Sequence, residues 1–180
     1  MIRKILTVLE PYFEFLVVMV IRNRHGEEHF KRWRLLWLPW YGDILYLHKI
    51  SKSDADPDRH NHPWDFWSLI LAGAYEEDFV KNGHYHRWLE EKHQRARWGM
   101  LPGNLPKSVQ VFGAGDLIKR RARDFHRIKL LDAPVWSLVW VGRRHPSPWG
   151  YATPRVFMDS ESYRKMQNER SRIDHDVCSS

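Results

Sequence analysis

Three histidines in this chain have the residue type and the spacing of a metal site. His60 and His62 stand two residues apart in the segment 59–63, just before an apolar run, and His126 lies on a later strand-like segment. Side chains two residues apart on a β-strand project from the same face, so His60 and His62 could hold one ion that His126 completes from another strand. The sequence therefore predicts a divalent metal centre with His60, His62 and His126 as its ligands.

The pair at His60 and His62 needs support from its context, because the chain has 11 histidines and a second such pair at His84 and His86. The second pair adjoins Gly83, and we expect it at the exposed tip of a hairpin within residues 79–88.

The order of the two histidine segments resembles that of the cupin superfamily. The first cupin motif runs from H-x-H to a Gly at a strand end, where this chain has His60, His62 and Gly73. The second motif begins with Gly-Asp and ends in a metal-binding His eleven positions after the Gly, where this chain has Gly115-Asp116 and His126. The second motif is the more specific half of the resemblance.

The resemblance covers residues 42 to 142 and implies a mainly β, single-domain cupin-type β-barrel, also called a double-stranded β-helix. Many cupins carry a ligand Glu where this chain has Phe66, flanked by Asp65 and Trp67. Strand parity puts Phe66 rather than Asp65 beside His62, so we expect a three-histidine centre without a carboxylate ligand. A β-bulge after Pro63 would reverse this by turning Asp65 inward.

Three neutral imidazoles leave positions open on Fe(II), where a substrate and O₂ could bind together, or on Zn²⁺, where a water is acidified for attack. Among cupins, such a site is similar to that of the cysteine dioxygenase-type thiol dioxygenases, whose Ser-Leu-His strand is similar in place to Ser137-Leu138-Val139. Val139 and Val141 stand where those enzymes place a His and a Tyr, so cysteine is not the expected substrate. We expect Fe(II) and O₂ chemistry on an unidentified small substrate, with Zn²⁺ or another divalent ion as the alternative.

Two other functions remain open at this point. A non-catalytic cupin could use the same barrel to bind a small molecule or a sugar. An epimerase or isomerase would need a general base and acid, and His126 with Tyr46 or Tyr75 could take those roles. A 2-oxoglutarate oxygenase is excluded more directly, because Asp65 follows His62 by three residues and the H-x-D pair is not present.

Several further side chains are candidates for the interior. His48 shares strand parity with Tyr46, so it could face the barrel as a core histidine or as a hydrogen-bond donor to the ligands. The residues 75–77, Tyr-Glu-Glu, follow Gly73, and we expect them on the surface, although one of them could point inward as an acid.

From Trp33 onward, short apolar segments alternate with turn residues, as in a β-sandwich or barrel. We expect a cupin barrel over residues 33–158, after an N-terminal helical extension over residues 1–32. The β-branched segment Val17 to Ile21 could equally be a strand. The polar tail, residues 159–180, is expected to contain a helix with Asp159 or Ser160 as its N-cap and to be disordered from about Asp174.

The composition fits one ordinary domain of 180 residues that is 43% hydrophobic, and most of the ten tryptophans should pack in the core or on the sheet. The single cysteine, Cys178, excludes an internal disulfide and favours a reducing, cytoplasmic location. The apolar stretch from Phe13 to Ile21 contains Glu14 and is far shorter than the roughly 20 residues that span a bilayer, so no membrane association is expected.

The chain is basic, with a net charge of +7, and its densest cluster is the segment 119–123, Lys-Arg-Arg-Ala-Arg, inside the second motif. Arg120, Arg121 and Arg123 could form a rim that attracts an anionic small-molecule substrate, or they could be a solvated face. No nucleic-acid recognition element accompanies the charge, so a nucleic-acid partner is not expected. A homodimer formed through an outer sheet face would suit the aromatic excess.

Overall fold

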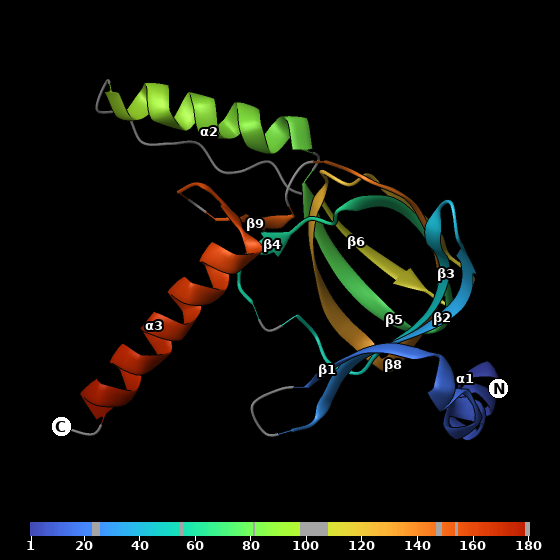
Figure 1. Cartoon of the computed structure of the whole chain (residues 1–180). Coiled ribbons are helices and arrows are strands. Elements are labelled where there is room, and N and C mark those ends of the chain that lie inside the picture. The colour runs from blue at the N-terminus through green and yellow to red at the C-terminus, as the bar shows by residue number, and fades with distance from the viewer. Residues whose placement is uncertain are drawn as a thin grey trace.

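A curled antiparallel sheet forms the body of the molecule in the computed structural model (Figure 1). The structure describes residues 1–22, 26–54, 56–80, 82–97, 108–146, 149–153 and 155–178. The strands are β1 (Val17–Arg22), β2 (Glu28–Leu38), β3 (Gly42–Ile50), β4 (Arg59–His60), β5 (Trp64–Val80), β6 (Ser108–Gly113), β7 (Leu117–Arg120), β8 (Phe125–Arg144), β9 (Gly150–Ala152) and β10 (Phe157–Asp159). The helices are α1 (Ile2–Leu9), the 3₁₀ helix η1 (Glu10–Leu16), α2 (Asn82–Arg97) and α3 (Ser160–Cys178).

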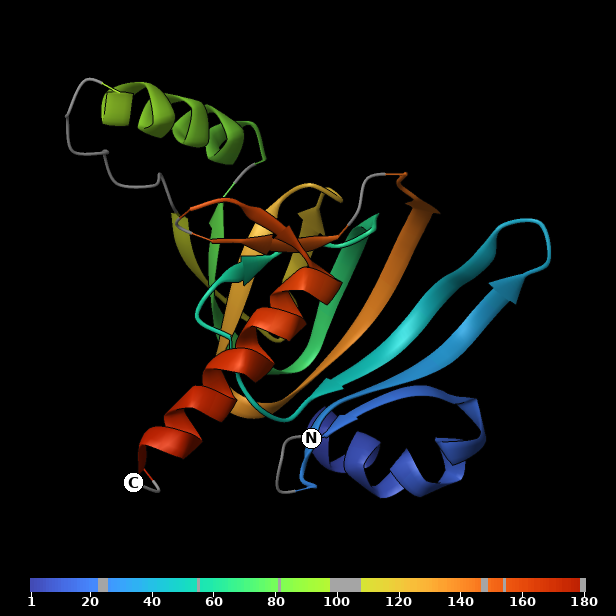
Figure 2. The same cartoon turned by 60° about the vertical axis from the view of Figure 1, so that its left-hand side comes forward.

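The long strand β8 organises the sheet. It pairs with β3 and β4 on one side and with β5 along most of its length on the other, while β5 also pairs with β6 and β7. The path β1-β2-β3-β8-β4-β9-β10 completes the sheet, which curls into a half-barrel (Figure 2). The predicted mainly β, single-domain architecture is therefore confirmed, with the sheet curled into a half-barrel.

The two faces of β2 and β3 have different neighbours because successive side chains alternate across a strand. On the outer face, Trp33, Leu47 and Trp136 form a buried cluster against α1 and η1, and the rings of Trp33 and Trp136 stack at 5.4 Å. On the inner face, Tyr46 packs with Val139 of β8. The inner face is the one that carries the candidate site.

An ionic cluster fixes η1 to the outer face of the sheet. The ammonium group of Lys31 is bound by the carboxylates of Glu10 (3.2 Å) and Glu14, and that of Lys49 by Glu10 at 2.8 Å and by Glu28 at 3.0 Å. Lys31 is buried, so this pairing supplies the counter-charges that a buried ammonium group requires.

The N-terminal region is helical only to Leu16. Residues 17–22 form β1 and pair with β2, which begins at Glu28, so the region that we expected to be a helical extension as far as residue 32 supplies an edge of the sheet. The run of β-branched side chains in Val17–Ile21 explains this outcome, because such residues favour extended backbone. The strand was the second of the two interpretations that the sequence left open.

Two helices differ from the sequence predictions. His84 and His86 lie in α2 rather than at a hairpin tip, since Tyr85, Trp88 and Leu89 recur at helical spacing and pack with Phe125. α3 begins as predicted, with the Asp159 carboxylate accepting the N–H groups of residues 161 and 162, but it continues to Cys178, past the expected start of disorder. Helix-forming residues fill its polar sequence.

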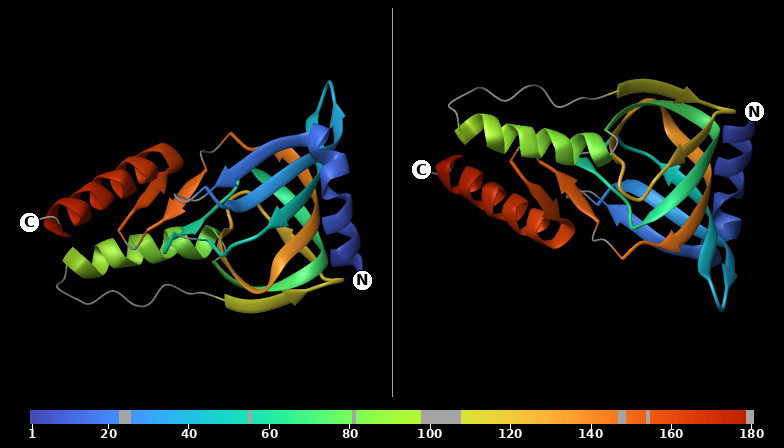
Figure 3. Two further views of the ribbon diagram at one scale, coloured as in Figure 1. Left: turned by 90° about the horizontal axis from the view of Figure 1, so that it is seen from below. Right: turned by 90° about the horizontal axis from the view of Figure 1, so that it is seen from above.

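Both α2 and α3 project from the end of the barrel that lies opposite α1 (Figure 3). Among the residues that the structure describes, no helix is both long enough and apolar enough to cross a membrane.

Candidate metal centre

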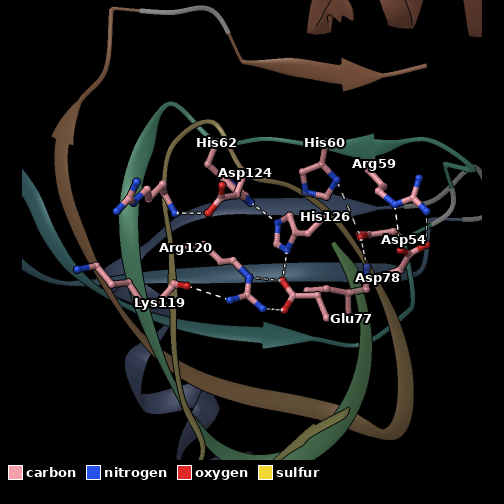
Figure 4. Close-up of polar contacts among 12 residues, drawn as sticks. Asp54, Arg59, His60, His62, Glu77, Asp78, Lys119, Arg120, Asp124 and His126 are labelled. Atoms are coloured by element: carbon pink, nitrogen blue, oxygen red, sulfur yellow. Dashed lines mark hydrogen bonds and ion pairs between the residues drawn. The ribbon is translucent and has the colours of Figure 1, made fainter. Parts of the chain in front are cut away.

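The three predicted ligand histidines meet at one end of the sheet (Figure 4). His60 is on β4, His62 follows it in the segment that leads to β5, and His126 is on β8, directly opposite His60 in the strand register. One nitrogen of each imidazole lies within 4.8 Å of the other two. The ring centroids are 4.9 to 5.2 Å apart, and the ring planes are inclined to one another by 53° to 72°.

Glu77 determines how His126 is oriented. Its Oε1 atom lies 2.5 Å from Nδ1 of His126, so the buried carboxylate accepts the Nδ1–H and leaves the lone pair of Nε2 directed at the other histidines. The Nε2 atoms of His126 and His62 are 2.7 Å apart. A histidine ligand held by a carboxylate in this way is the usual arrangement around protein-bound metals.

Arg120 in turn holds Glu77. Its Nε donates to Oε1 of Glu77 at 3.1 Å, and its NH2 group pairs with Oε2. Burial alone would raise the pKa of the Glu77 carboxyl, but the hydrogen bond from His126 and the guanidinium of Arg120 hold this pKa below its usual range. Glu77 is therefore a buried carboxylate anion with two charge-assisted partners.

The inward position of Glu77 differs from the surface position that we expected, and a bulge explains the difference. The buried side chains of β5 occupy even positions up to Ala72 and odd positions at Tyr75 and Glu77. Between them lies Gly73, with φ of +86° and an irregular register on both sides. The bulge exchanges the two faces of the strand. A glycine inside an apolar strand is the signal in the sequence that could have indicated this.

The surroundings keep His60 and His62 neutral. Desolvation and the nearby His126 lower the pKa of His60 to about 4, and the same two causes hold the pKa of His62 well below its usual value. The carboxylate of Asp54 lies 4.0 Å from Nδ1 of His60 and accepts the backbone N–H of Ile128 at 2.7 Å. Neutral imidazoles have the free lone pairs that metal coordination requires.

Phe66 and Asp65 lie as strand parity predicts. The ring of Phe66 is 5.1 Å from that of His62 and 6.2 Å from that of His126, so an aromatic ring occupies the place of a fourth ligand. Asp65 points to the outer surface, where it accepts the backbone N–H of Ala122 at 2.7 Å and lines a pocket that includes Trp67. The register of β5 with β8 is irregular between Trp64 and Phe66, but Asp65 still faces outward.

The basic segment 119–123 does not act as one unit. Arg120 is largely buried and bound to Glu77, which corrects its prediction as a rim residue. Lys119 lies on the outer face, with its ammonium group 4.7 Å from the ring of Trp67. Arg121 and Arg123 are exposed, as a rim or a solvated face requires.

Tyr75 is poorly suited to the acid or base role considered for an isomerase. It is buried among Ile70, Ile118 and Val135, and burial raises the pKa of its hydroxyl far above the usual value. Tyr46 and His48 lie instead on the inner face of β3, and the ring of His48 packs 5.8 Å from that of Tyr46.

No protein-family model and no curated protein matches this chain. Among solved structures, a Drosophila melanogaster CENP-C cupin domain is 10% identical, with 68% of this chain and 72% of that chain covered and a TM-score of 0.40. The hydroxypropylphosphonic acid epoxidase from S. wedmorenis is 8% identical (69% and 54% covered, TM-score 0.44), and an oxalate decarboxylase variant from Bacillus subtilis is 14% identical (64% and 25% covered, TM-score 0.41). The chain thus spans about half of the epoxidase.

At these identities, the likeness concerns the fold alone. The cupin resemblance of the sequence agrees with the curled sheet and with the meeting of the histidines from both motifs at one point. The finer likeness to cysteine dioxygenase-type enzymes is not confirmed by these structures.

Proposed function

We propose that this protein is a metal-dependent enzyme in which His60, His62 and His126 hold one divalent ion, with Fe(II) favoured, and that it oxidises a small substrate with O₂. The observation that carries the proposal is the convergence of three imidazole nitrogens within 4.8 Å, beside a buried carboxylate that fixes one of the rings. Zn²⁺ is the main alternative ion, because imidazole ligands suit both metals.

The donor set fits such an ion. Two of the imidazoles are neutral through desolvation, and the third presents its Nε2 lone pair because Glu77 takes its Nδ1–H. Three neutral ligands leave the charge of a divalent ion uncompensated at the site, and the Glu77 anion supplies one negative charge next to the ligands. When bound, Fe(II) would supply open coordination positions for O₂ and substrate together.

The remaining side chains position and shield the site. Arg120 keeps Glu77 in its anionic form and in place, so that His126 cannot rotate away. Phe66 places an apolar ring against His62 and His126, which excludes water from that side and leaves no carboxylate to fill a coordination position. With three imidazole ligands and no carboxylate ligand, a bound ion would keep coordination positions open for a substrate group.

The direct test is the metal content of the protein and of its histidine variants. We expect one ion per chain in protein loaded with Fe(II) without oxygen, and loss of stoichiometric binding in His60→Ala, His62→Ala and His126→Ala. His84→Ala is the matched control, because His84 is exposed on α2. Equal metal content in wild type and His126→Ala, with both proteins folded, would contradict the site.

Nitric oxide then tests the assignment of the metal and of the reaction class. It binds to Fe(II) centres that have an open position and gives a characteristic electron paramagnetic resonance signal, so it reports on O₂ access without a known substrate. We expect this signal in the Fe(II) form of the wild type. A protein that takes up Zn²⁺ stoichiometrically but gives no such signal with Fe(II) would favour hydrolytic or non-catalytic roles instead.

A further inference from the structure

Arg32 lies on the inner face of the sheet, within a group of aromatic side chains. Its guanidinium carbon is 4.7 Å from the ring centroid of Tyr46, 5.3 Å from that of Phe30 and 5.8 Å from that of Trp64. Its Nε donates a hydrogen bond to Nε2 of His48 at 3.0 Å, across the pairing of β2 with β3. We call these five residues the Arg32 cluster.

The Arg32 cluster adjoins the candidate metal centre. Trp64 and Tyr46 pack in the same hydrophobic cluster as Phe66, whose ring contacts His62 and His126. Desolvation and the neighbouring His126 and His60 are the largest causes of the lowered pKa of His62, and the charge of Arg32 is a smaller one. The guanidinium therefore acts electrostatically on a predicted metal ligand. One aromatic layer thus separates a fixed cation from the three histidines.

Most side chains of the Arg32 cluster are partly accessible to solvent. The side chains of Arg32, His48 and Trp64 are only half-buried, whereas Lys31 and Trp33 on the outer face of the same strand are buried. Desolvation, helped by the charge of Arg32, nevertheless holds the pKa of His48 well below its usual value. Side chains that solvent reaches but that are surrounded by protein are those that a small ligand can contact.

We propose that Arg32 binds the carboxylate of the substrate and thereby directs the rest of the molecule toward His60, His62 and His126. The inference rests on the proposed function for the reaction, but binding of the carboxylate itself does not require the metal. The protein would accordingly act on a small monocarboxylate whose reacting group lies a few bonds from the acid.

The chemistry of the cluster favours a carboxylate. A guanidinium is a planar fork with five N–H donors, which matches the two oxygens of a carboxylate, and the bond from Nε to His48 fixes the plane of this fork. The aromatic rings lower the local dielectric constant, which strengthens an ion pair that forms there, and they offer apolar surface to the carbon skeleton of the ligand.

The proposal is tested by calorimetric titration of the full chain with acetate, propionate and benzoate, and with acetamide and benzamide as neutral counterparts. We expect the acids to bind and the amides to bind at least tenfold more weakly. In Arg32→Gln the affinity for the acids should fall by about tenfold to a hundredfold, the loss typical of a charge-assisted hydrogen bond, and Arg32→Lys should recover only part of it. Arg121→Gln is the matched control and should bind as the wild type does.

Each titration is performed on metal-free protein and on protein loaded with Zn²⁺, so that the two proposals can fail separately. Carboxylates that bind only to the loaded protein, with equal affinity in Arg32→Gln, would coordinate the ion directly and would overturn the role of Arg32. A wild type that takes up metal but binds none of the acids would also overturn it. A wild type that takes up no metal but binds acids through Arg32 would overturn the proposed function and leave this inference standing.

Discussion

The carboxylate of Glu77 accepts the Nδ1–H of His126 at 2.5 Å, and both side chains are almost completely buried, with 1% and 4% of their surfaces exposed. Glu77 is on β5 and His126 is on β8, and these two strands pair directly with each other. The sheet therefore fixes the backbone of both partners. His126 is thus oriented before any ion binds. Preorientation of this kind reduces the entropy that coordination costs.

Replacement of Glu77 by Gln should weaken metal binding by about tenfold to a hundredfold, the range typical for the carboxylate partner of a histidine ligand. The amide keeps the shape of the side chain but removes the negative charge that faces His126 and Arg120. Competition with a chromophoric chelator for Zn²⁺ measures the affinity.

The matched control is Glu76→Gln, which changes the neighbouring position on the opposite face of β5 and should leave the affinity unchanged. If Glu77→Gln and Glu76→Gln bound Zn²⁺ equally well, with both proteins folded, Glu77 would have no role in the centre.

Asp65 and Phe66 allow a test of the ligand number. Asp65→Asn should bind metal within about threefold of the wild type, as expected for a change of about 0.5 kcal/mol or less at a surface position, because Asp65 faces outward and Asn can still accept the N–H of Ala122. Phe66→Glu places a carboxylate beside His62 and should tighten binding by about tenfold, or about 1.4 kcal/mol. Titration of both variants with Fe(II) or Zn²⁺ measures this. A hundredfold loss in Asp65→Asn would mean that the three-histidine assignment is wrong.

The sequence was sufficient to predict which histidines meet and which way Phe66 points. Motif spacing identified His60, His62 and His126, and the alternation of side chains along a strand separated Phe66 from Asp65. Both inferences depend on the spacing of residues within short segments. Along a regular strand, the alternation of side chains between the two faces holds over a few residues.

The parts that escaped prediction depend on irregular or long-range structure. Glu77 lies beyond the bulge at Gly73, so parity counted from His62 gives the wrong face for it. Arg120 looked like one member of a charged surface run, because the carboxylate that pairs with it is 43 residues away in the sequence. α2 replaces the expected hairpin because Tyr85, Trp88 and Leu89, which recur at helical spacing, pack against Phe125, about 40 residues away in the sequence.

Gly73→Ala should destabilise the protein by at least about 2 kcal/mol, because it combines an unfavourable backbone conformation with a steric clash. The backbone at Gly73 has φ of +86°, and a Cβ atom there would lie 2.6 Å from the carbonyl oxygen of Asp132. Gly113→Ala, where a Cβ atom would meet nothing closer than 4.0 Å, is the control and should change stability by no more than about 0.5 kcal/mol. Urea unfolding monitors both variants. Equal midpoints would show that β5 does not need the bulge.

The metal-free protein should lose stability as the pH falls from about 6.5 toward 4. Desolvation and the proximity of His126 lower the pKa of His60 to about 4 in the folded protein, whereas an unfolded histidine titrates near 6.5. Between these values the unfolded chain binds more protons than the folded one, so the free energy of unfolding decreases with decreasing pH, and the loss is complete below the folded pKa. Because the side chain of His60 remains 20% exposed, its share of the loss should not exceed about 3 kcal/mol.

His62 and His48, whose pKa values are also lowered, add to the same slope, while the lowered pKa of Glu77 acts below about pH 4.5 and can be separated by its range. Urea unfolding at pH 7 and pH 5 in the presence of a chelator measures the effect. His60→Gln should lose less stability than the wild type between these two conditions, and the control His84→Gln should lose as much as the wild type. A wild type that is equally stable at pH 7 and pH 5 would show that these imidazoles are not desolvated, and the neutral ligand set inferred for the centre would no longer hold.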